Sequence, residues 1–182
     1  MARPRSFDRD DALATAMRVF WERGYEETSI SDLTQAIGIA PPSLYAAFGD
    51  KRRLFEEAAA RYADEPSGTV VARGLAQPTA REAVETIFRE AAREYARPGH
   101  PRGCFITSEP GLAELRTRSR AAIRARIARG ADAGELPPDV DVDALAGYVA
   151  MVISGLSARA RDGATTAELE AVAATAMRAW PA

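Results

Sequence analysis

The sequence has little of the material from which most catalytic and metal sites are built: it contains one cysteine, one histidine and one lysine. A lone Cys104 excludes an intramolecular disulfide and is typical of a reducing compartment. His100 and Cys104 together supply too few ligands to close a metal site, so we predict no metal and no other cofactor. A nucleophilic role for Cys104 would need an oriented base, and only His100 is available, so no catalytic residue is predicted.

Long apolar runs are also missing. The longest candidate, Leu145–Leu156, falls short of the roughly 20 apolar residues that a membrane span requires. The charged start, MARPRSFDRDDA, lacks the apolar segment of a secretion signal. We therefore expect a cytoplasmic protein with no membrane partner.

The composition, 47% hydrophobic and 27% charged, is that of a folded globular protein. Its net charge of −2 means that any contact with nucleic acid must come from local basic groups. Two such groups are present: Arg3 with Arg5, and the run from Lys51 to Arg53. The alternative for that run is a solvated charged surface.

Helical periodicity dominates, which predicts an all-α protein without internal repeats. Asp8 and Ser29 are N-cap residues for two helices that end at Gly24 and Gly38. A third helix is predicted from Pro41 to Phe48, and a fourth begins after Asp50. Further helices are expected at about 70–75, 79–97, 110–131, 142–161 and 166–180.

The second and third predicted helices have the dimensions of a helix-turn-helix motif. A helix about 10 to 12 Å in diameter fits the major groove of B-DNA, about 12 Å wide, when neighbouring helices hold it clear of the protein body. Leu33, Ile37, Leu44 and Phe48 are expected to provide that support. The alternative is a helical hairpin packed inside a bundle.

The stretch from Phe20 to Leu54 closely resembles the DNA-binding domain of the tetracycline-repressor-like (TetR) family. The matching positions are Phe20, Gly24, Ser29, Leu33, Ala36, Gly38, Leu44, Tyr45, Phe48, Lys51 and Leu54. The resemblance implies an N-terminal three-helix DNA-binding domain at residues 1–50, linked by a helix at 51–65 to a helical ligand-binding and dimerisation domain at 66–182. It implies a homodimer that binds a palindromic operator in double-stranded DNA.

The resemblance also assigns roles to individual residues. Ser29 or Thr28, Tyr45 and Lys51 would contact the phosphate backbone, and Pro42, Ser43 and Ala47 would lie nearest the bases. The full predicted DNA-binding set is Arg3, Arg5, Thr28, Ser29, Pro41, Pro42, Ser43, Tyr45, Ala47 and Lys51. Tyr45 alone could equally be a core-flanking tyrosine. Many relatives carry a serine and a polar residue where this chain has Pro41 and Pro42, which shifts base recognition toward apolar contact and DNA shape.

The segment Leu145–Leu156 is apolar nearly all round, which predicts a helix buried on every face. With an apolar stripe on the last helix it would form a four-helix bundle across a two-fold axis. The alternative is a core within one chain. The stripe consists of Leu169, Val172, Ala173, Ala176 and Met177.

The candidates to line an effector pocket are Phe88, Tyr95, Cys104, Phe105, Tyr148 and Met151, all equally credible as core. Gly103-Cys104 resembles a motif of some family members that sense electrophiles, oxidants or metals, and Arg102 and a helix start would make the thiol reactive. The alternative, which we favour, is a small buried apolar residue. The arginines at 116, 118, 120, 124, 126 and 129 are expected to form a solvated helix exterior.

These patterns predict a transcriptional regulator, most simply a repressor released from its operator by a small-molecule effector. Two other interpretations stay open: a helical interaction module with a degenerate helix-turn-helix, and a thiol-based sensor that acts through Cys104.

Overall fold

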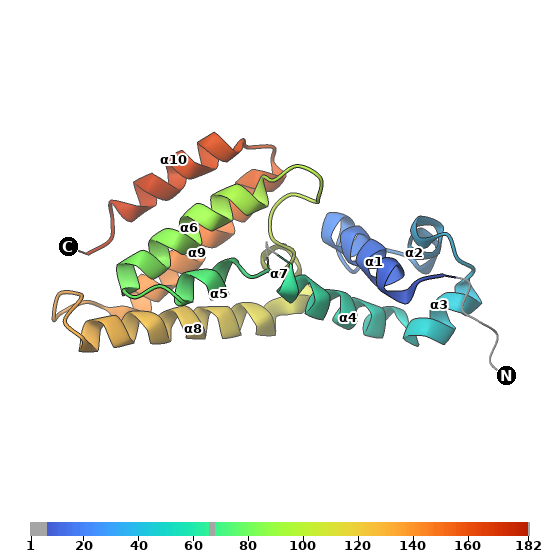
Figure 1. Cartoon of the computed structure of the whole chain (residues 1–182), viewed down its shortest axis with the longest axis horizontal. Helices are drawn as coiled ribbons and strands as arrows, with labels where there is room; N and C mark the ends of the chain where they lie inside the picture. Colours follow the sequence, from blue (N-terminus) through green and yellow to red (C-terminus); the bar gives the residue numbers. More distant parts are fainter. Residues whose placement is uncertain (1–6, 66–67, 182) are drawn as a thin grey trace. The chain divides into compact units, whose positions relative to one another are not determined.

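The computed structural model describes residues 7–65 and 68–181, and all regular structure in these residues is helical, as predicted (Figure 1). The chain forms two compact units, residues 1–64 and 65–182. The helix that the sequence suggested as a linker belongs by its contacts to the first unit, where it packs on the first helix.

The first unit contains four helices: α1 (Arg9–Arg23), α2 (Ile30–Ile37), α3 (Pro41–Phe48) and α4 (Lys51–Asp64). Their ends lie where the capping residues predict. The Asp8 carboxylate accepts hydrogen bonds from the N–H groups of Asp10 and Asp11, and the Gly24 N–H donates to the carbonyl of Phe20. These bonds satisfy backbone groups that a helix end leaves without partners.

The core of this unit is aromatic. Phe20 is fully buried, and its ring meets Phe55 of α4 edge to face at 5.3 Å between centroids. Trp21 meets Tyr62 in the same way at 4.9 Å. Because both pairs join α1 to α4, these two helices form the base on which α2 and α3 rest.

Replacing Phe20 with alanine is expected to lower the free energy of unfolding of this unit by about 3–5 kcal/mol, since a buried ring is lost and a cavity remains. The measurement is urea unfolding followed by Trp21 fluorescence in a Trp180→Phe background. Arg18→Ala, at an exposed position on the same helix, is the control and should change stability by less than about 0.5 kcal/mol. Equal stability of the two variants would contradict this description of the core.

The second unit is organised around one central helix, α6 (Ala80–Tyr95), which contacts four others. These are α5 (Val70–Leu75), α8 (Ala113–Asp132), α9 (Val142–Arg161) and α10 (Thr166–Met177). The helix predicted at 110–131 opens as a short 3-10 turn, η1 (Pro110–Leu112), and the last helix ends three residues early. A short helix that was not predicted separately, α7 (Phe105–Ser108), precedes η1.

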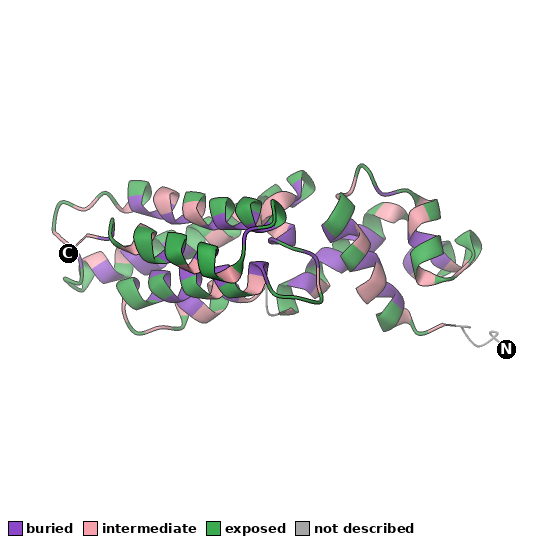
Figure 2. Ribbon diagram, turned by 90° about the horizontal axis from the view of Figure 1, so that it is seen from above, coloured by how far each residue is buried: buried purple, intermediate pink, exposed green. Residues whose placement is uncertain are grey.

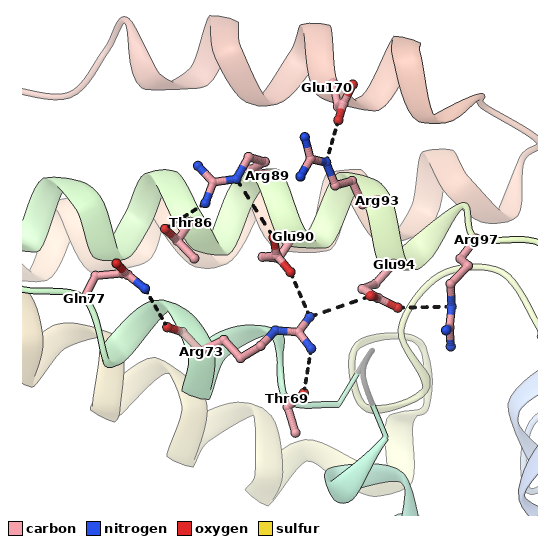
Figure 3. Close-up of polar contacts among 10 residues, drawn as sticks. All are labelled: Thr69, Arg73, Gln77, Thr86, Arg89, Glu90, Arg93, Glu94, Arg97 and Glu170. Carbon is pink, nitrogen blue, oxygen red and sulfur yellow. Dashed lines mark hydrogen bonds and ion pairs between the residues drawn. The ribbon is translucent and has the colours of Figure 1, made fainter.

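A network of ion pairs holds the short α5 against α6 (Figure 3). Arg73 of α5 lies 3.1 Å from the carboxylate of Glu90 and 3.9 Å from that of Glu94. Arg97 approaches Glu94 to 3.2 Å. The pairs are partly buried, so solvent screens them less than it screens exposed pairs. A six-residue helix has little stability of its own, and we ascribe its position to these contacts.

The predicted arginine exterior of α8 is wrong at two positions. Arg126 is buried, where its guanidinium donates to the carbonyl of Pro78 and lies 3.8 Å from Glu135. Arg116 is partly buried and donates to the carbonyls of Ile106, Glu109 and Pro110. Both side chains satisfy carbonyls at the ends of neighbouring segments, which lie outside any local pattern. The other four arginines are exposed as predicted.

Helix α9 is covered on one side only, contrary to the prediction that it is buried all round (Figure 2). Leu145, Val149, Ile153 and Leu156 point into the unit, whereas Met151 is 68% exposed. By length and composition α9 could also cross a membrane, but core helices of soluble proteins pass the same test.

Candidate nucleic-acid interface

Helix α2 begins with a complete capping box. The Ser29 hydroxyl accepts from the Asp32 N–H at 3.0 Å, and the Asp32 carboxylate accepts from the Ser29 N–H at 2.9 Å and hydroxyl at 2.5 Å. These two bonds from Ser29, and then the Arg23 guanidinium 2.7 Å away, lower the pKa of Asp32 below its ordinary value. The Arg23 pair links α1 to α2, so the start of α2 is held from two sides.

Thr28 does not occupy the exposed position that a phosphate contact requires. It is 1% exposed, and its hydroxyl donates to the carbonyl of Gly24 at 2.6 Å. It therefore closes the turn between α1 and α2. Of the two residues predicted as alternatives, Ser29 remains exposed, although its hydroxyl proton is engaged in the capping box.

The turn between α2 and α3 depends on Gly38, whose φ of +77° lies in the left-handed region that favours glycine. Its N–H donates to the carbonyl of Thr34, so α2 stops there. Ala40 then precedes Pro41 and Pro42, which start α3 without losing a helical hydrogen bond. The result is two short helices separated by a tight turn.

Helix α3 is attached to the unit by two residues and exposes most of the rest. Leu44 and Phe48 are buried, as predicted. Pro41, Pro42, Tyr45 and Ala46 are exposed, with Tyr45 at 48%, and Ser43 and Ala47 are half-buried. The alternative of a hairpin packed inside a bundle is therefore wrong within this unit.

Arg9 is a residue of this interface that the sequence reasoning missed. Its guanidinium lies 4.5 Å from the ring centroid of Phe48, donates to the Ala47 carbonyl at 3.3 Å, and pairs with Glu57 at 2.6 Å. It thereby joins α1, the end of α3 and α4. These partners lie 38 and 48 residues away in sequence, so no local pattern could have found them.

Lys51, at the start of α4, has a defined position. Its ammonium lies 4.2 Å from the centroid of the Tyr25 ring, a cation–π contact that orients the side chain while the residue stays half-exposed. Arg52 forms an exposed pair with Glu56 at 2.7 Å. Thus α3 and the start of α4 carry the predicted residues from Pro41 to Lys51, while Arg3 and Arg5 lie outside the described residues.

The second unit contains an apolar cavity of about 80 Å³ next to α5. Of the six predicted lining residues, Tyr95 and Cys104 line it. Burial raises the pKa of the Tyr95 hydroxyl well above its ordinary value, and the adjacent Cys104 thiol raises it further, so this hydroxyl stays neutral. The other lining residues are Gly68, Val70, Val71, Ile106, Thr107, Arg116, Ser119, Arg120, Ile123, Ala150, Ile153 and Ser154.

The remaining four predicted lining residues lie elsewhere. Phe105 is completely buried in the core. The rings of Phe88 and Tyr148 meet at 6.5 Å, and the Tyr148 hydroxyl donates to the carbonyl of Ala176 on α10. Met151 lies on the exposed side of α9, because the helical period places it opposite Val149 and Ile153.

Cys104 is buried, and its surroundings differ from those predicted. Its N–H donates to the Ser157 hydroxyl at 2.9 Å. The preceding Gly103 has a φ of +80° and packs so closely on α9 that a Cβ would lie 2.9 Å from the Ser157 carbonyl. Arg102 donates to the carbonyls of Ala160 and Ala164 at the end of α9, so it does not activate the thiol.

An apolar surface runs along the sides of α9 and α10 that the unit leaves uncovered. We call it the α9/α10 face. Its largest exposed side chains are Met151 and Val172, at 68% and 50%. Its other exposed or half-exposed members are small or apolar: Ala144, Gly147, Val152, Ser154, Gly155, Ala158, Ala167 and Ala171.

Comparisons with known proteins agree with this geometry. Residues 12–58 match the family described as "Bacterial regulatory proteins, tetR family". The chain is 35% identical to the HTH-type transcriptional repressor ComR of Escherichia coli K12, over 98% of this chain and 91% of that protein. It is 32% identical to the repressor AcnR of Corynebacterium efficiens, over 90% and 87%.

Among solved structures, a cysteine mutant of the TetR family transcriptional regulator CifR, in complex with 26-bp operator DNA, superposes with a TM-score of 0.92. The two chains are 40% identical over 99% of this chain and 100% of that one. The match extends through both compact units, so it covers far more than the helix-turn-helix. This chain therefore belongs to the TetR family of bacterial transcriptional regulators.

Proposed function

We propose that this chain is a cytoplasmic transcriptional repressor without catalytic activity, which binds a palindromic operator as a homodimer and is released by a small-molecule effector. Residues 1–50, with the helix at 51–65, would carry DNA binding, and residues 66–182 would carry effector binding and dimerisation. The exposed α3, held at Leu44, Ala47 and Phe48, is the observation on which the proposal chiefly rests.

The support for DNA binding is steric and chemical. Helix α3 has the diameter of a major-groove reader and exposes the side opposite Leu44 and Phe48. Tyr45 and Lys51 flank it, and both can donate to phosphates, which fix orientation without reading sequence. The relatives ComR and AcnR are named repressors, and CifR was solved on operator DNA.

The support for a homodimer is the α9/α10 face. An apolar surface of this kind on a folded chain marks an interaction site. A two-fold pair of these faces would give a four-helix bundle, in which the small residues allow close approach. The two copies of α3 would then address half-sites about one helical turn apart.

The support for an effector site is the cavity behind α5. Its 80 Å³ is well below the roughly 300–1,000 Å³ of sites for drug-sized ligands, so the effector is either very small or enters by displacing α5. Val70 and Val71 of α5 form one wall, and Arg73 holds that helix to α6. A displaced α5 is a direct way for a bound molecule to alter the second unit.

The test is selection of bound sequences from a library of randomised duplexes, followed by binding measurements on the enriched site and on scrambled DNA. We expect a palindrome bound at least about 1,000-fold more tightly than scrambled DNA, the lower end for specific regulators. An interaction module with a degenerate helix-turn-helix would enrich no sequence, and that result would overturn the proposal.

Replacing Lys51 with alanine is expected to weaken binding to operator and to scrambled DNA alike. Each lost phosphate contact also reduces the slope of log affinity against log salt by about one per half-site. The measurement is a salt titration by fluorescence anisotropy. Arg18→Ala, a charge removal on the exposed side of α1, is the matched control. An unchanged slope in Lys51→Ala would show that Lys51 does not contact phosphate.

A second candidate function, thiol sensing, is favoured by one observation: Cys104 lines the cavity beside Tyr95. Its burial at 6% exposure and its distance from any activating cation favour a packing role instead. We expect Cys104→Ser to leave operator affinity within about twofold, since the surface change is small. Loss of release by a thiol-alkylating reagent in this variant, with release intact in the parent protein, would establish the sensing role.

A further inference from the structure

The exposed side of α3 is unusual for a helix that reads DNA because it offers almost nothing that can form a hydrogen bond. Its sequence, PPSLYAAF, contains no charged residue and no amide side chain. Arginine, lysine, asparagine and glutamine make the common base-specific hydrogen bonds in the major groove. Selectivity on this helix must therefore come mainly from another kind of contact.

The backbone at the start of α3 offers no donor either. Pro41 and Pro42 lack an N–H group, and the next two N–H groups, of Ser43 and Leu44, both donate to the carbonyl of Ala40. Ala40 supplies no side-chain cap. The usual anion-binding property of a helix N-terminus is thus absent at the place that would come closest to the bases.

What α3 does expose is apolar. Pro42 and Ala46 lie four residues apart, one turn of helix, so they share a side, and both are exposed. That side is opposite the buried Leu44 and Phe48. The apolar group that a major groove presents is the 5-methyl group of a pyrimidine, which thymine carries and cytosine does not.

We propose that Pro42 and Ala46 recognise the 5-methyl group of a pyrimidine in each operator half-site, with no hydrogen bond to that base. The inference rests on the proposed function, since it requires α3 to lie in the major groove. It has a consequence that hydrogen-bond readout would not share. Thymine and 5-methylcytosine carry the same methyl group but opposite hydrogen-bonding groups, so this surface accepts both and discriminates against uracil and cytosine.

The experiment measures affinity for the selected operator after replacing its thymines, one symmetric pair at a time, with deoxyuridine, cytosine or 5-methylcytosine. At one pair we expect deoxyuridine and cytosine to weaken binding by about fourfold per half-site, or about fifteenfold for the palindrome, the usual value of a buried methyl group. The 5-methylcytosine operator should bind within about twofold of the thymine operator, because the methyl contact is kept.

A variant shows whether the methyl effect passes through this surface. In Pro42→Ala, a change that a helix tolerates well, the ratio of thymine to deoxyuridine affinity should move toward one. Lys51→Ala is the matched control, which should weaken both duplexes and keep the ratio. A deoxyuridine effect that persists unchanged in Pro42→Ala would assign it to DNA stiffness and overturn the proposal.

Other results would overturn the inference without touching the proposed function. If the operator is bound specifically but deoxyuridine binds as well as thymine at every pair, selectivity comes from elsewhere, such as the exposed Ser31 and Gln35 of α2. If 5-methylcytosine binds as weakly as cytosine, the base is read by its hydrogen-bonding edge. If no sequence is enriched, the proposed function fails and this inference fails with it. The arms that vary only the DNA use the unmodified protein, so they do not depend on the folding of any variant.

Discussion

Ala46→Glu is expected to weaken operator binding by at least about 100-fold while leaving the fold intact, because a carboxylate at an operator contact faces phosphate charge and has no partner there. Ala46 is exposed in the middle of α3, so the larger side chain meets no neighbour in the free protein. Glutamate is also a good helix former, which keeps the cost to α3 small. The measurement is fluorescence anisotropy with the selected duplex.

The control for that variant is Ala60→Glu, which adds the same charge at an exposed position on α4. We expect it to lower affinity by a few-fold at most, through long-range repulsion that salt screens. Matching thermal unfolding of both variants would exclude a folding defect. If the two variants bound equally well, α3 would not lie at the DNA, and the proposed interface would be wrong.

Met151→Arg is expected to separate the homodimer and to reduce operator affinity by about 100-fold or more, since two linked modules gain that much over one. The side chain is 68% exposed in the single chain, so arginine is tolerated there until a second copy covers it. Burial of two unpaired guanidinium groups then opposes association. Sedimentation velocity gives the oligomeric state, and the same duplex gives the affinity.

The matched control is Ala125→Arg, which introduces arginine on the exposed side of α8, outside the α9/α10 face. It should remain dimeric with unchanged affinity. A Met151→Arg protein that sediments as a dimer at micromolar concentration would show that the α9/α10 face does not mediate association. A monomer that still bound the palindrome with full affinity would instead separate dimerisation from DNA recognition.

The boundaries of most helices could be predicted from residues within a few positions of each end. Asp8, Ser29 and Gly38 act on backbone groups two to four residues away, and each does in the structure what its chemistry predicts. Prolines at the start of α3 are equally local. The predictions failed where the sequence offers no such local signal, as at the early end of α10.

The candidate interface was predictable to the same extent. The exposure of Pro42, Tyr45 and Ala46 follows from the helical period once Leu44 and Phe48 are assigned to the core. Thr28 was misjudged because its neighbour Ser29 is equally suited to a cap, and only the turn geometry decides which hydroxyl points inward. The position of Lys51 depends on Tyr25, which no spacing rule connects to it.

By itself, the sequence determined the number and order of the main helices and the residues that α3 can present, because capping, proline geometry and helical period act over one or two turns. Only the tertiary structure decided the partners of Arg9 and Arg126, the composition of the cavity, and the side of α9 that stays uncovered. These depend on which distant segments cover a side chain. An apolar stretch such as Leu145–Leu156 has the same hydrophobic pattern whether its second side meets its own chain or another copy.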